Sequence, residues 1–373
     1  MSSTALPEGW VFKPFPETVN RYQSKGGKLK TTEYEQSGNL PVVDQGRSLV
    51  VGYCSDERQR FQGPYPIIVF GDHTRNVKLV EFSFAVGADG AVLLGPTDRD
   101  ELDIKFLYYW LKYVPLHNLG YSRHFKLLKD EEVAFPNDIN EQRRIVARIE
   151  EQTHRAEETR KLAVEREAEL DTLLQALYSR MIQGVDWQPL HEVASLVRRP
   201  VKTKPEGRYE EMGIRSFGKG TFQKPVLTGK QIGNKRIYTI HEGDLVFNNV
   251  FAWEKAIAVA KDEDHGRVGS HRFITYVPHD GRATSEFLCH HFLGERGIED
   301  IRAASPGSAG RNRTLGLNKL DKILVPVPDY DEQKRFAEIA KRRQRVQIET
   351  AAIEDELKAF HAALLDKAFR GEL

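Results

Sequence analysis

Arginine, asparagine, histidine and lysine side chains gather in polar segments of both halves of this 373-residue chain. Arginine can donate two parallel hydrogen bonds to a guanine edge, asparagine can pair with adenine in a similar way, and lysine mostly neutralises phosphate. In the N-terminal half the candidates are Arg47, His73, Thr74, Arg75, Lys78, Tyr121, Ser122 and Arg123. In the C-terminal half they are Arg215, Lys219, Lys224, Asn248, Asn249, Trp253, Ser308, Arg311, Asn312 and Arg313. For any one of them a solvated surface role is the commoner outcome, and the four favoured for base contacts are Arg75, Arg123, Arg311 and Arg313.

The distribution of charge gives modest support to contacts with nucleic acid. The formal net charge of the whole chain is only +1. Residues 185–325, however, carry 22 Lys+Arg against 17 Asp+Glu, whereas every other segment is slightly acidic. A local excess of cationic side chains is the electrostatic footprint expected of a surface that meets phosphates.

Motifs that resemble catalytic sites have simpler explanations. The chain has no Pro-Pro pair, which the base-holding loop of DNA amino-methyltransferases requires. The segment "GIRSFGKG" ends in Gly220 and lacks the Ser/Thr hydroxyl that holds magnesium in a P-loop. Asp329 and Glu332 resemble nuclease carboxylates, but helix capping explains both acids. The histidines and the two distant cysteines do not have zinc-ligand spacing. We therefore predict no catalytic site, no metal and no cofactor in this chain.

Composition and length favour a multidomain protein of the cytoplasm. At this length two or three domains are expected, and 40% hydrophobic residues are enough to build their cores. No apolar run approaches the roughly 18 residues of a membrane helix, and the N-terminal "MSSTALPEGW" does not have the pattern of a secretory signal. Two cysteines, Cys54 and Cys289, make no disulfide framework. We expect a soluble, cytoplasmic chain without a membrane segment.

The same helix-start motif occurs twice in the sequence. "DINEQRRIVARIEEQ" begins at Asp138 and "DYDEQKRFAEIAKRR" begins at Asp329. In both, Asp and Glu have the spacing of a capping box, and Pro136 or Pro328 stands just upstream, where it blocks backward extension of a helix. Glycines at 184 and 371 are suited to end the two helices.

Each long helix carries a seam of apolar residues at coiled-coil spacing. In the first helix the seam positions are Ile145, Ile149, Ala156, Ala163, Leu170, Leu173 and Leu177. In the second they are Phe336, Ile339, Val346, Thr350, Ile353, Leu357, Phe360 and Leu364. The polar seam residues Gln152, Arg166 and Arg343 can fix the register between partners. Two solvated helices on unrelated cores remain the simpler alternative.

A globular segment with shared landmarks precedes each long helix. Each opens with a tryptophan and a short amphipathic stretch, "GWVFKPFPETV" or "WQPLHEVASLV". Each has a late helix, "DIKFLYYWLKY" or "TSEFLCHHFLGE", followed by a polar loop and a short strand. Between these landmarks "YPIIVFG", "KLVEFSFAVG", "GDLVFNNV" and "AIAVAK" are predicted strands. The sequences between these landmarks differ in the two segments, as expected for two modules that bind different ligands.

Taken together, these features resemble the specificity (S) subunits of Type I restriction-modification systems. The proline followed by "EQRRIV" or "EQKRFA" at a long helix is the most specific part of the resemblance. "FGDHTRNVKLVEFSFAVGADGAVLL" looks like part of a first target-recognition domain, and "EGDLVFNNVFAWEKAIAVA" like the equivalent strand pair of the second.

The resemblance implies an α+β fold with two globular α/β target-recognition domains, separated by two long antiparallel coiled-coil helices in a pseudo-twofold repeat. The domains would be residues 1–134, a central spacer helix at 135–184, residues 185–325, and a C-terminal spacer helix at 326–373. Each globule would recognise half of a bipartite, asymmetric target in double-stranded DNA.

The resemblance also implies partners. Two methylation (M) subunits and restriction (R) subunits would join one copy of this chain. S-adenosylmethionine, ATP and Mg would be bound by those partners and not by this chain. A one-turn difference in length between the spacer helices departs from perfect symmetry. An S-like subunit of another anti-phage defence assembly, or a coiled-coil scaffold that binds only protein, are the alternatives.

Overall fold

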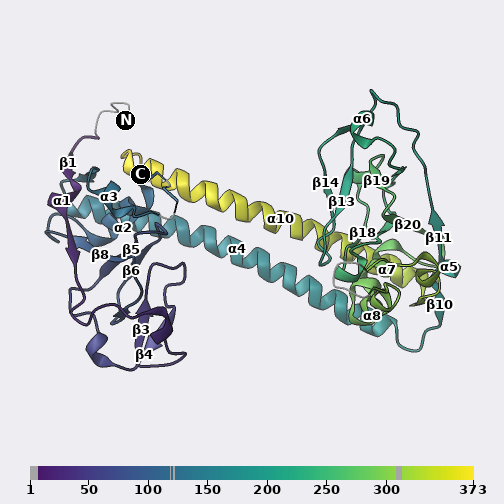
Figure 1. Cartoon of the computed structure of the whole chain (residues 1–373), viewed down its shortest axis with the longest axis horizontal. Coiled ribbons are helices and arrows are strands. Elements are labelled where there is room, and N and C mark those ends of the chain that lie inside the picture. Colours follow the sequence, from purple (N-terminus) through teal and green to yellow (C-terminus); the bar gives the residue numbers. More distant parts are fainter. Residues whose placement is uncertain (1–6, 118, 121, 308–312) are drawn as a thin grey trace. The chain divides into compact units, whose positions relative to one another are not determined.

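The computed structural model describes residues 7–117, 119–120, 122–307 and 313–373. The chain divides into two compact units (Figure 1). The first unit comprises residues 1–161 and 352–373, and the second unit comprises residues 162–351. Two long helices, α4 (Ile139–Met181) and α10 (Tyr330–Phe369), each contribute one end to each unit.

The first unit is built on a four-stranded antiparallel sheet. Its strand order is β2 (Val19–Tyr22), β8 (Ala91–Pro96), β5 (Ile67–Gly71), β6 (Val77–Val80). A second pair joins β1 (Trp10–Pro14) to β9 (Glu132–Pro136), the strand that leads into α4. A small sheet, inserted between these elements in sequence, holds β4 (Gly52–Cys54), β3 (Leu40–Val43) and β7 (Ala85–Val86). The short helices are α1 (Phe15–Thr18), α2 (Ile104–Tyr113) and α3 (Phe125–Leu128).

The second unit repeats this order with different insertions. Its sheet runs β11 (Ala194–Val197), β20 (Phe273–Pro278), β17 (Leu245–Asn248), β18 (Ile257–Val259). The pair β10 (Trp187–Pro189) and β21 (Leu324–Pro326) leads into α10. The inserted strands are β12 (Arg208–Tyr209), β13 (Met212–Ile214), β14 (Thr221–Gln223), β15 (Leu227–Thr228), β16 (Ile237–Thr239) and β19 (Val268–Ser270). The short helices are α5 (Leu190–Val193), α6 (Gly229–Ile232), α7 (Ser285–Leu293), α8 (Glu295–Ala303) and α9 (Leu317–Leu320).

One predicted strand is wrong in its extent. "KLVEFSFAVG" forms two strands, β6 and β7, because the chain leaves the main sheet after Val80. Phe84 is fully buried in the break, and β7 then pairs in parallel with β3 in the small sheet. A continuous apolar pattern cannot reveal such a change of sheet, since both pieces are buried.

A glutamine of the duplicated motif joins each long helix to its globule. Gln142 is fully buried, and its Nε2 donates to the carbonyls of Glu101 and Pro136, both at 2.8 Å. Its Oε1 accepts from the N–H of Asp103, the N-cap of α2, at 2.8 Å. All the polar atoms of the amide are therefore used, as burial requires.

Gln333 makes the same three bonds in the second unit. Its Nε2 donates to the carbonyls of Arg282 and Pro328 at 3.0 Å, and its Oε1 accepts from the N–H of Thr284, the N-cap of α7, at 3.1 Å. We call this arrangement the glutamine lock. It explains the glutamine of the motif after each proline, because this side chain fixes the long helix to the late helix.

The predicted aspartate caps are present, but among the described residues neither glutamate makes the reciprocal bond. Asp329 Oδ1 accepts from the N–H of Glu332 at 3.0 Å, as the capping box predicts. Asp138 Oδ1 instead accepts from the N–H of Asn140 at 2.9 Å. The predicted return bond of Glu141 is wrong, because its carboxylate is held by Arg144 one turn further along, at 2.6 and 2.7 Å.

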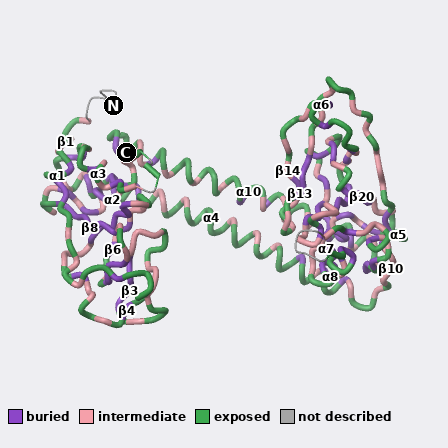
Figure 2. Tube along the Cα trace, in the orientation of Figure 1, coloured by how far each residue is buried: buried purple, intermediate pink, exposed green. Residues whose placement is uncertain are grey.

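Six of the fifteen predicted apolar seam positions are buried, seven are half-buried, and two are exposed. Ile145, Ile149, Phe336, Val346 and Leu364 are buried as predicted. Leu173 is wrong: it is 44% exposed while Leu174 is 4% exposed, because the end of α4 turns its face toward α7 as well as α10. Phe360 is also wrong, because its side chain is 37% exposed. The polar seam residue Arg166 is exposed and pairs with Glu349 of the other long helix at 3.5 Å, as a register contact would. Figure 2 shows that the central turns of both helices are largely exposed.

Both helices stop near the predicted glycines. Gly184 and Gly371 have φ values of +69° and +72°, which glycine adopts without steric cost. At the end of α10, Glu372 N–H bonds the Lys367 carbonyl and Gly371 N–H bonds that of Ala368. This pair of bonds is a Schellman motif, the usual way in which a glycine closes a helix.

Candidate nucleic-acid interface

Three candidate residues of each unit lie at or just after corresponding strand ends. β5 ends at Gly71 and β17 ends at Asn248, and these strands hold the same place in their sheets. The next residue, Asp72 or Asn249, donates its N–H to the neighbouring strand connection, at Gly90 (2.7 Å) or Arg272 (2.8 Å). Its carbonyl then accepts an N–H from the polar loop that follows the late helix. The fold thus brings two distant loops together at the same position in each unit.

In the first unit a buried histidine holds the polar loop. His124 is fully buried, and both its N–H and its Nδ1 lie within 2.9 Å of the Asp72 carbonyl. The Asp72 carboxylate accepts from the N–H of Phe125 at 2.8 Å and so caps the start of α3. Ser122 and the exposed Arg123 directly precede this anchor. Arg123 is therefore presented from a fixed backbone.

Arg75 stands at the tip of the β5–β6 turn. Its φ is +61°, its side chain is exposed, and its Nη1 donates to the Leu116 carbonyl at 3.0 Å. This bond joins the turn to the polar loop a second time. Four N–H donors of the guanidinium have no partner among the described residues, which leaves its fork available for a bidentate acceptor.

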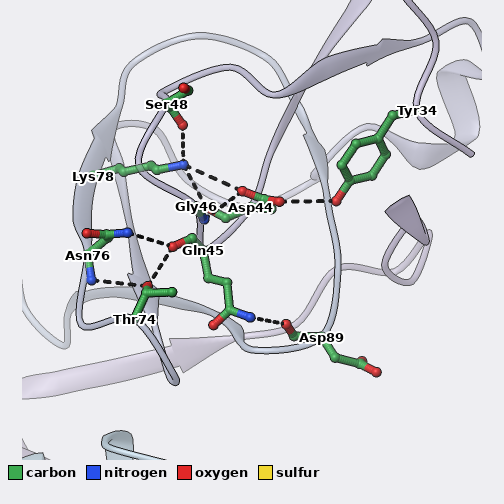
Figure 3. Close-up of polar contacts among 9 residues, drawn as sticks. All are labelled: Tyr34, Asp44, Gln45, Gly46, Ser48, Thr74, Asn76, Lys78 and Asp89. Carbon is green, nitrogen blue, oxygen red and sulfur yellow. Dashed lines mark hydrogen bonds and ion pairs between the residues drawn. The ribbon is translucent and has the colours of Figure 1, made fainter. Parts of the chain in front are cut away.

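A third loop supports the turn from the side, as Figure 3 shows. The Gln45 carbonyl accepts from Thr74 Oγ1 at 2.6 Å and from Asn76 Nδ2 at 3.0 Å, while Gln45 Nε2 donates to the Asp89 carbonyl at 2.9 Å. The backbone N–H of His73 donates to Gln45 Oε1 at 3.2 Å. Thr74 is thus committed to the fold by its hydroxyl. Arg47 lies exposed in this same loop.

Lys78 does not face outward as a phosphate-binding lysine would. Its side chain is 6% exposed, and Nζ donates to the carbonyls of Asp44 (2.8 Å) and Ser48 (Figure 3). Burial lowers the pKa of Lys78, partly offset by the Asp44 carboxylate. Burial and Asp44 also raise the pKa of Tyr34 to about 12. Lys78 is a structural residue of the loop that carries Arg47, which corrects its predicted role.

In the second unit the arginine comes from the polar loop, and an aromatic ring that follows β17 supports it. The Asn249 carbonyl accepts from the N–H of Leu315 at 2.8 Å and so anchors the polar loop. The guanidinium of Arg313 lies 5.3 Å from the centre of the Trp253 ring, a cation–π contact. The indole N–H of Trp253 donates to the Val250 carbonyl at 2.9 Å, which fixes the ring. The Asn248 side chain accepts from the N–H of Val250 at 3.2 Å.

The remaining candidates are placed elsewhere or lie outside the described residues. Tyr121, Ser308, Arg311 and Asn312 are among the residues that the structure does not describe. Arg215 and Lys219 are exposed in the turn between β13 and β14. Lys224 is half-buried and pairs with Glu211 at 3.0 Å, so its charge is already neutralised. The segment "GIRSFGKG" is therefore part of a β-hairpin.

Sequence reasoning missed cations near Arg123. Arg21 and Lys28 are exposed, and the pKa of Lys28 is lowered by burial, with Arg21 and Arg123 as repelling cationic neighbours. The carboxylates of Asp89 and Asp72 act on Lys28 in the opposite direction, so cations and anions are mixed around this residue. They come from different loops, so only the fold could bring them together. His124, Asp72 and Gln45 were missed too, because anchoring residues have no sequence signature of their own.

The described part of the chain contains neither a cluster of metal-ligating residues nor a membrane-spanning helix. No group of three or more His, Cys, Asp or Glu residues is placed there to hold a metal ion. Among its helices, none is long and apolar enough to cross a membrane.

The fold is that of known restriction-modification specificity subunits. The chain matches the HsdS subunit from Thermoanaerobacter tengcongensis with a TM-score of 0.50 and 19% identity, over 100% of this chain and 99% of that one. It matches the S subunit of a Type I restriction-modification system from M. genitalium with a TM-score of 0.58 and 15% identity, over 98% of both chains. A chain from a structure of type I R-M complex assembly gives a TM-score of 0.60 at 17% identity.

The sequence comparison agrees with the fold. The chain is 22% identical over 359 residues to the EcoR124I/EcoR124II specificity subunit of Escherichia coli, covering 87% of this chain and 84% of that protein. No protein-family model matches the chain. The chain is thus similar in sequence to a Type I specificity subunit and shares its fold with solved HsdS subunits. The resemblance and the α+β fold class that the sequence predicted are confirmed.

Proposed function

We propose that this chain is the DNA sequence-recognition subunit of a Type I restriction-modification complex. Each globule would read one half of a bipartite, asymmetric target in double-stranded DNA. The observation that carries the proposal is the repeated interface at the ends of β5 and β17. The backbone bonds of Asp72 and Asn249 are the same, whereas the side chains that they present differ. Two such modules suit two different half-sites.

The chain would contribute recognition, and its partners the chemistry. One copy would assemble with two methylation subunits, and restriction subunits would join the larger complex. S-adenosylmethionine, ATP and Mg would be bound by these partners. The near-neutral net charge of +1 agrees with such a division, because the partners can supply much of the phosphate neutralisation.

The long helices would serve as the spacer between the half-sites. Within the second unit α4 and α10 run antiparallel, as the ion pairs of Arg343 with Asp171 and of Arg166 with Glu349 require. The Arg343 guanidinium is bidentate on Asp171, at 2.7 and 3.0 Å, and lies 3.3 Å from Glu167. This is the register contact that a polar seam residue provides.

A salt titration of DNA binding tests the proposal. The chain, reconstituted with its methylation subunit, should bind duplex DNA with log K falling linearly against log salt, at a slope near −0.9 for each neutralised phosphate. The chain alone should bind more weakly. Native mass spectrometry should find one copy in the complex. A reconstituted complex that binds no duplex would instead support a scaffold that binds only protein.

A further inference from the structure

The turn between β13 and β14 presents an exposed aromatic side chain that the interface described above does not use. Phe217 is 72% exposed, the largest value among the exposed large hydrophobic residues of the described chain. Its φ is +63°, a conformation that is uncommon for a bulky residue. Gly218 and Gly220 beside it also have positive φ values, so the backbone turns sharply at this position.

This turn is held rigidly against the candidate interface. Phe217 N–H donates to the Glu254 carbonyl at 2.7 Å, and Gly218 N–H donates to that of Lys255 at 3.0 Å. Ser216 Oγ donates to the Glu254 carboxylate at 3.3 Å. Glu254 and Lys255 directly follow Trp253, the residue that supports Arg313. The phenylalanine is thus fixed to the same segment that carries the second interface.

Cationic side chains flank the exposed ring. Arg215 donates to the Thr221 carbonyl at 3.0 Å and lies over the Phe222 ring at 4.7 Å, and Lys219 is exposed. No carboxylate among the described residues forms an ion pair with Arg215, Lys219 or Lys255. A protruding apolar side chain between unpaired cations has the chemistry of a wedge, which enters the base stack while the cations hold the adjacent phosphates.

We propose that Phe217 inserts between base pairs of the bound duplex, next to the half-site that the second unit reads. This inference rests on the proposed function. Insertion unstacks one base step and bends the duplex, so Phe217 favours deformable steps without any hydrogen bond to a base. The first unit has no counterpart among its described residues, because the β13–β14 hairpin belongs to an insertion specific to the second unit.

The test uses the complex reconstituted with the methylation subunit, and duplexes that carry 2-aminopurine at successive positions of the target. Wild type should raise the fluorescence at one step near one half-site. Phe217→Ala should abolish that rise and weaken binding roughly tenfold, the order expected for one aromatic–base stack. Its salt slope should stay unchanged, since the phosphate contacts are kept. Phe12→Ala, which removes another exposed phenylalanine (51% exposed), is the matched control and should behave as wild type.

Phe217→Gly distinguishes the loss of the inserted ring from misfolding of the turn. Glycine accepts a φ of +63° without strain, so this variant should melt no lower than wild type and still lose the fluorescence rise. An unchanged rise in Phe217→Ala would overturn the proposal.

A rival occupant would give a different result. The turn borders a groove of about 820 Å³ lined by Leu293 of α7 and Ile348 of α10. If Phe217→Ala released the methylation subunit without DNA present, the ring would belong to a protein contact and the wedge would be wrong. A wild-type complex that binds no duplex would contradict the proposed function itself.

Discussion

The two units share a polar frame and differ in what they build around it. Gln142 and Gln333 make the same three hydrogen bonds, and each connects a long helix to the N-cap of a late helix. The apolar contacts of those late helices are not the same. Seven residues after its N-cap, α2 has Trp110, whereas α7 has His291; both are buried. The two units therefore share the hydrogen bonds of the glutamine, which need a defined geometry, but differ in the side chains that fill the space beside the late helix.

The interfaces show the same contrast. Asp72 and Asn249 place two loops with matching backbone bonds. The arginines on those loops are supported differently, Arg75 by the Leu116 carbonyl and Arg313 by the Trp253 ring. Arg75 lies in the turn and contacts the polar loop, whereas Arg313 lies in the polar loop and contacts the turn, so the two units present their arginines from opposite partners of the same pair of loops.

Removing a glutamine lock should have the largest effect on stability. Leucine at Gln142 or Gln333 leaves one N–H and two carbonyls without partners in a buried site. We expect a loss of about 4 kcal/mol in the free energy of unfolding. Hydrogen-exchange mass spectrometry should show loosening of the first unit in Gln142→Leu and of the second in Gln333→Leu. Gln152→Ala, on the same face of α4, should cost less than about 0.5 kcal/mol. Equal loosening of both units by either variant would mean that the locks are not local.

Acid should destabilise the second unit selectively. Burial lowers the pKa of His291 from 6.5 to about 4, helped by Arg296 and His290. The unfolded chain therefore takes up the proton first. The stability contributed by neutral His291 is complete above pH 6.5 and is lost as the pH falls toward 4, by on the order of 3 kcal/mol.

His291→Gln provides the control for this pH dependence. It keeps a partner for the Tyr178 hydroxyl, which lies 2.7 Å from His291 Nδ1, but it cannot titrate. Urea denaturation at pH 7 and pH 5 should show a smaller pH dependence in the variant. An unchanged dependence would assign the acid sensitivity to other groups, His290 among them, whose pKa is also lowered to about 4 by burial.

Arginine substitutions should separate the two half-sites. Arg75→Ala should relax discrimination in one half-site and Arg313→Ala in the other, each by about 1–3 kcal/mol. Competition between duplexes randomised in one half-site measures both effects. Trp253→Ala should act in the same half-site as Arg313→Ala, because the ring positions the guanidinium. Relaxation of both halves by one substitution would contradict the assignment of one unit to each half.

The smallest effect is expected from the register contact between the long helices. Arg343→Ala removes the bidentate pair with Asp171, whose side chain is 52% exposed. Solvent screening limits such a pair to about 0.5 kcal/mol. Thermal denaturation should show a shift of only a few degrees. A substitution of Leu174, 4% exposed, by alanine should cost several times more.

The sequence predicted what local patterns determine. The long helices, their aspartate caps, their terminal glycines, the late helices and the strand pair β17–β18 follow from capping residues and from periodicity. The candidate residues around Asn249 and Trp253 stay a prediction, made because they cluster in polar loops. The two helix entries also follow from the sequence, but capping alone does not account for the glutamine that both copies contain and that forms the glutamine lock.

What the sequence could not predict depends on contacts between distant segments. Nothing near Lys78 indicates that Asp44 and Ser48 will bury its ammonium. The exposure of Leu173 in place of Leu174 is decided by α7, more than a hundred residues away. The fully buried His124 looks like any loop histidine until the fold sets it against Asp72. Tertiary packing therefore decides which polar residues support the loops and which remain free to bind.

The most direct test that each unit reads one half-site is a map of modified bases in host DNA after co-expression of this chain with its methylation subunit. If each unit reads one half-site, the map will show one motif of two short half-sites around a fixed gap, in which Arg75→Ala alters only one half and Arg313→Ala only the other. No new methylation in the presence of an active methylation subunit, or a motif without two separable halves, would contradict it.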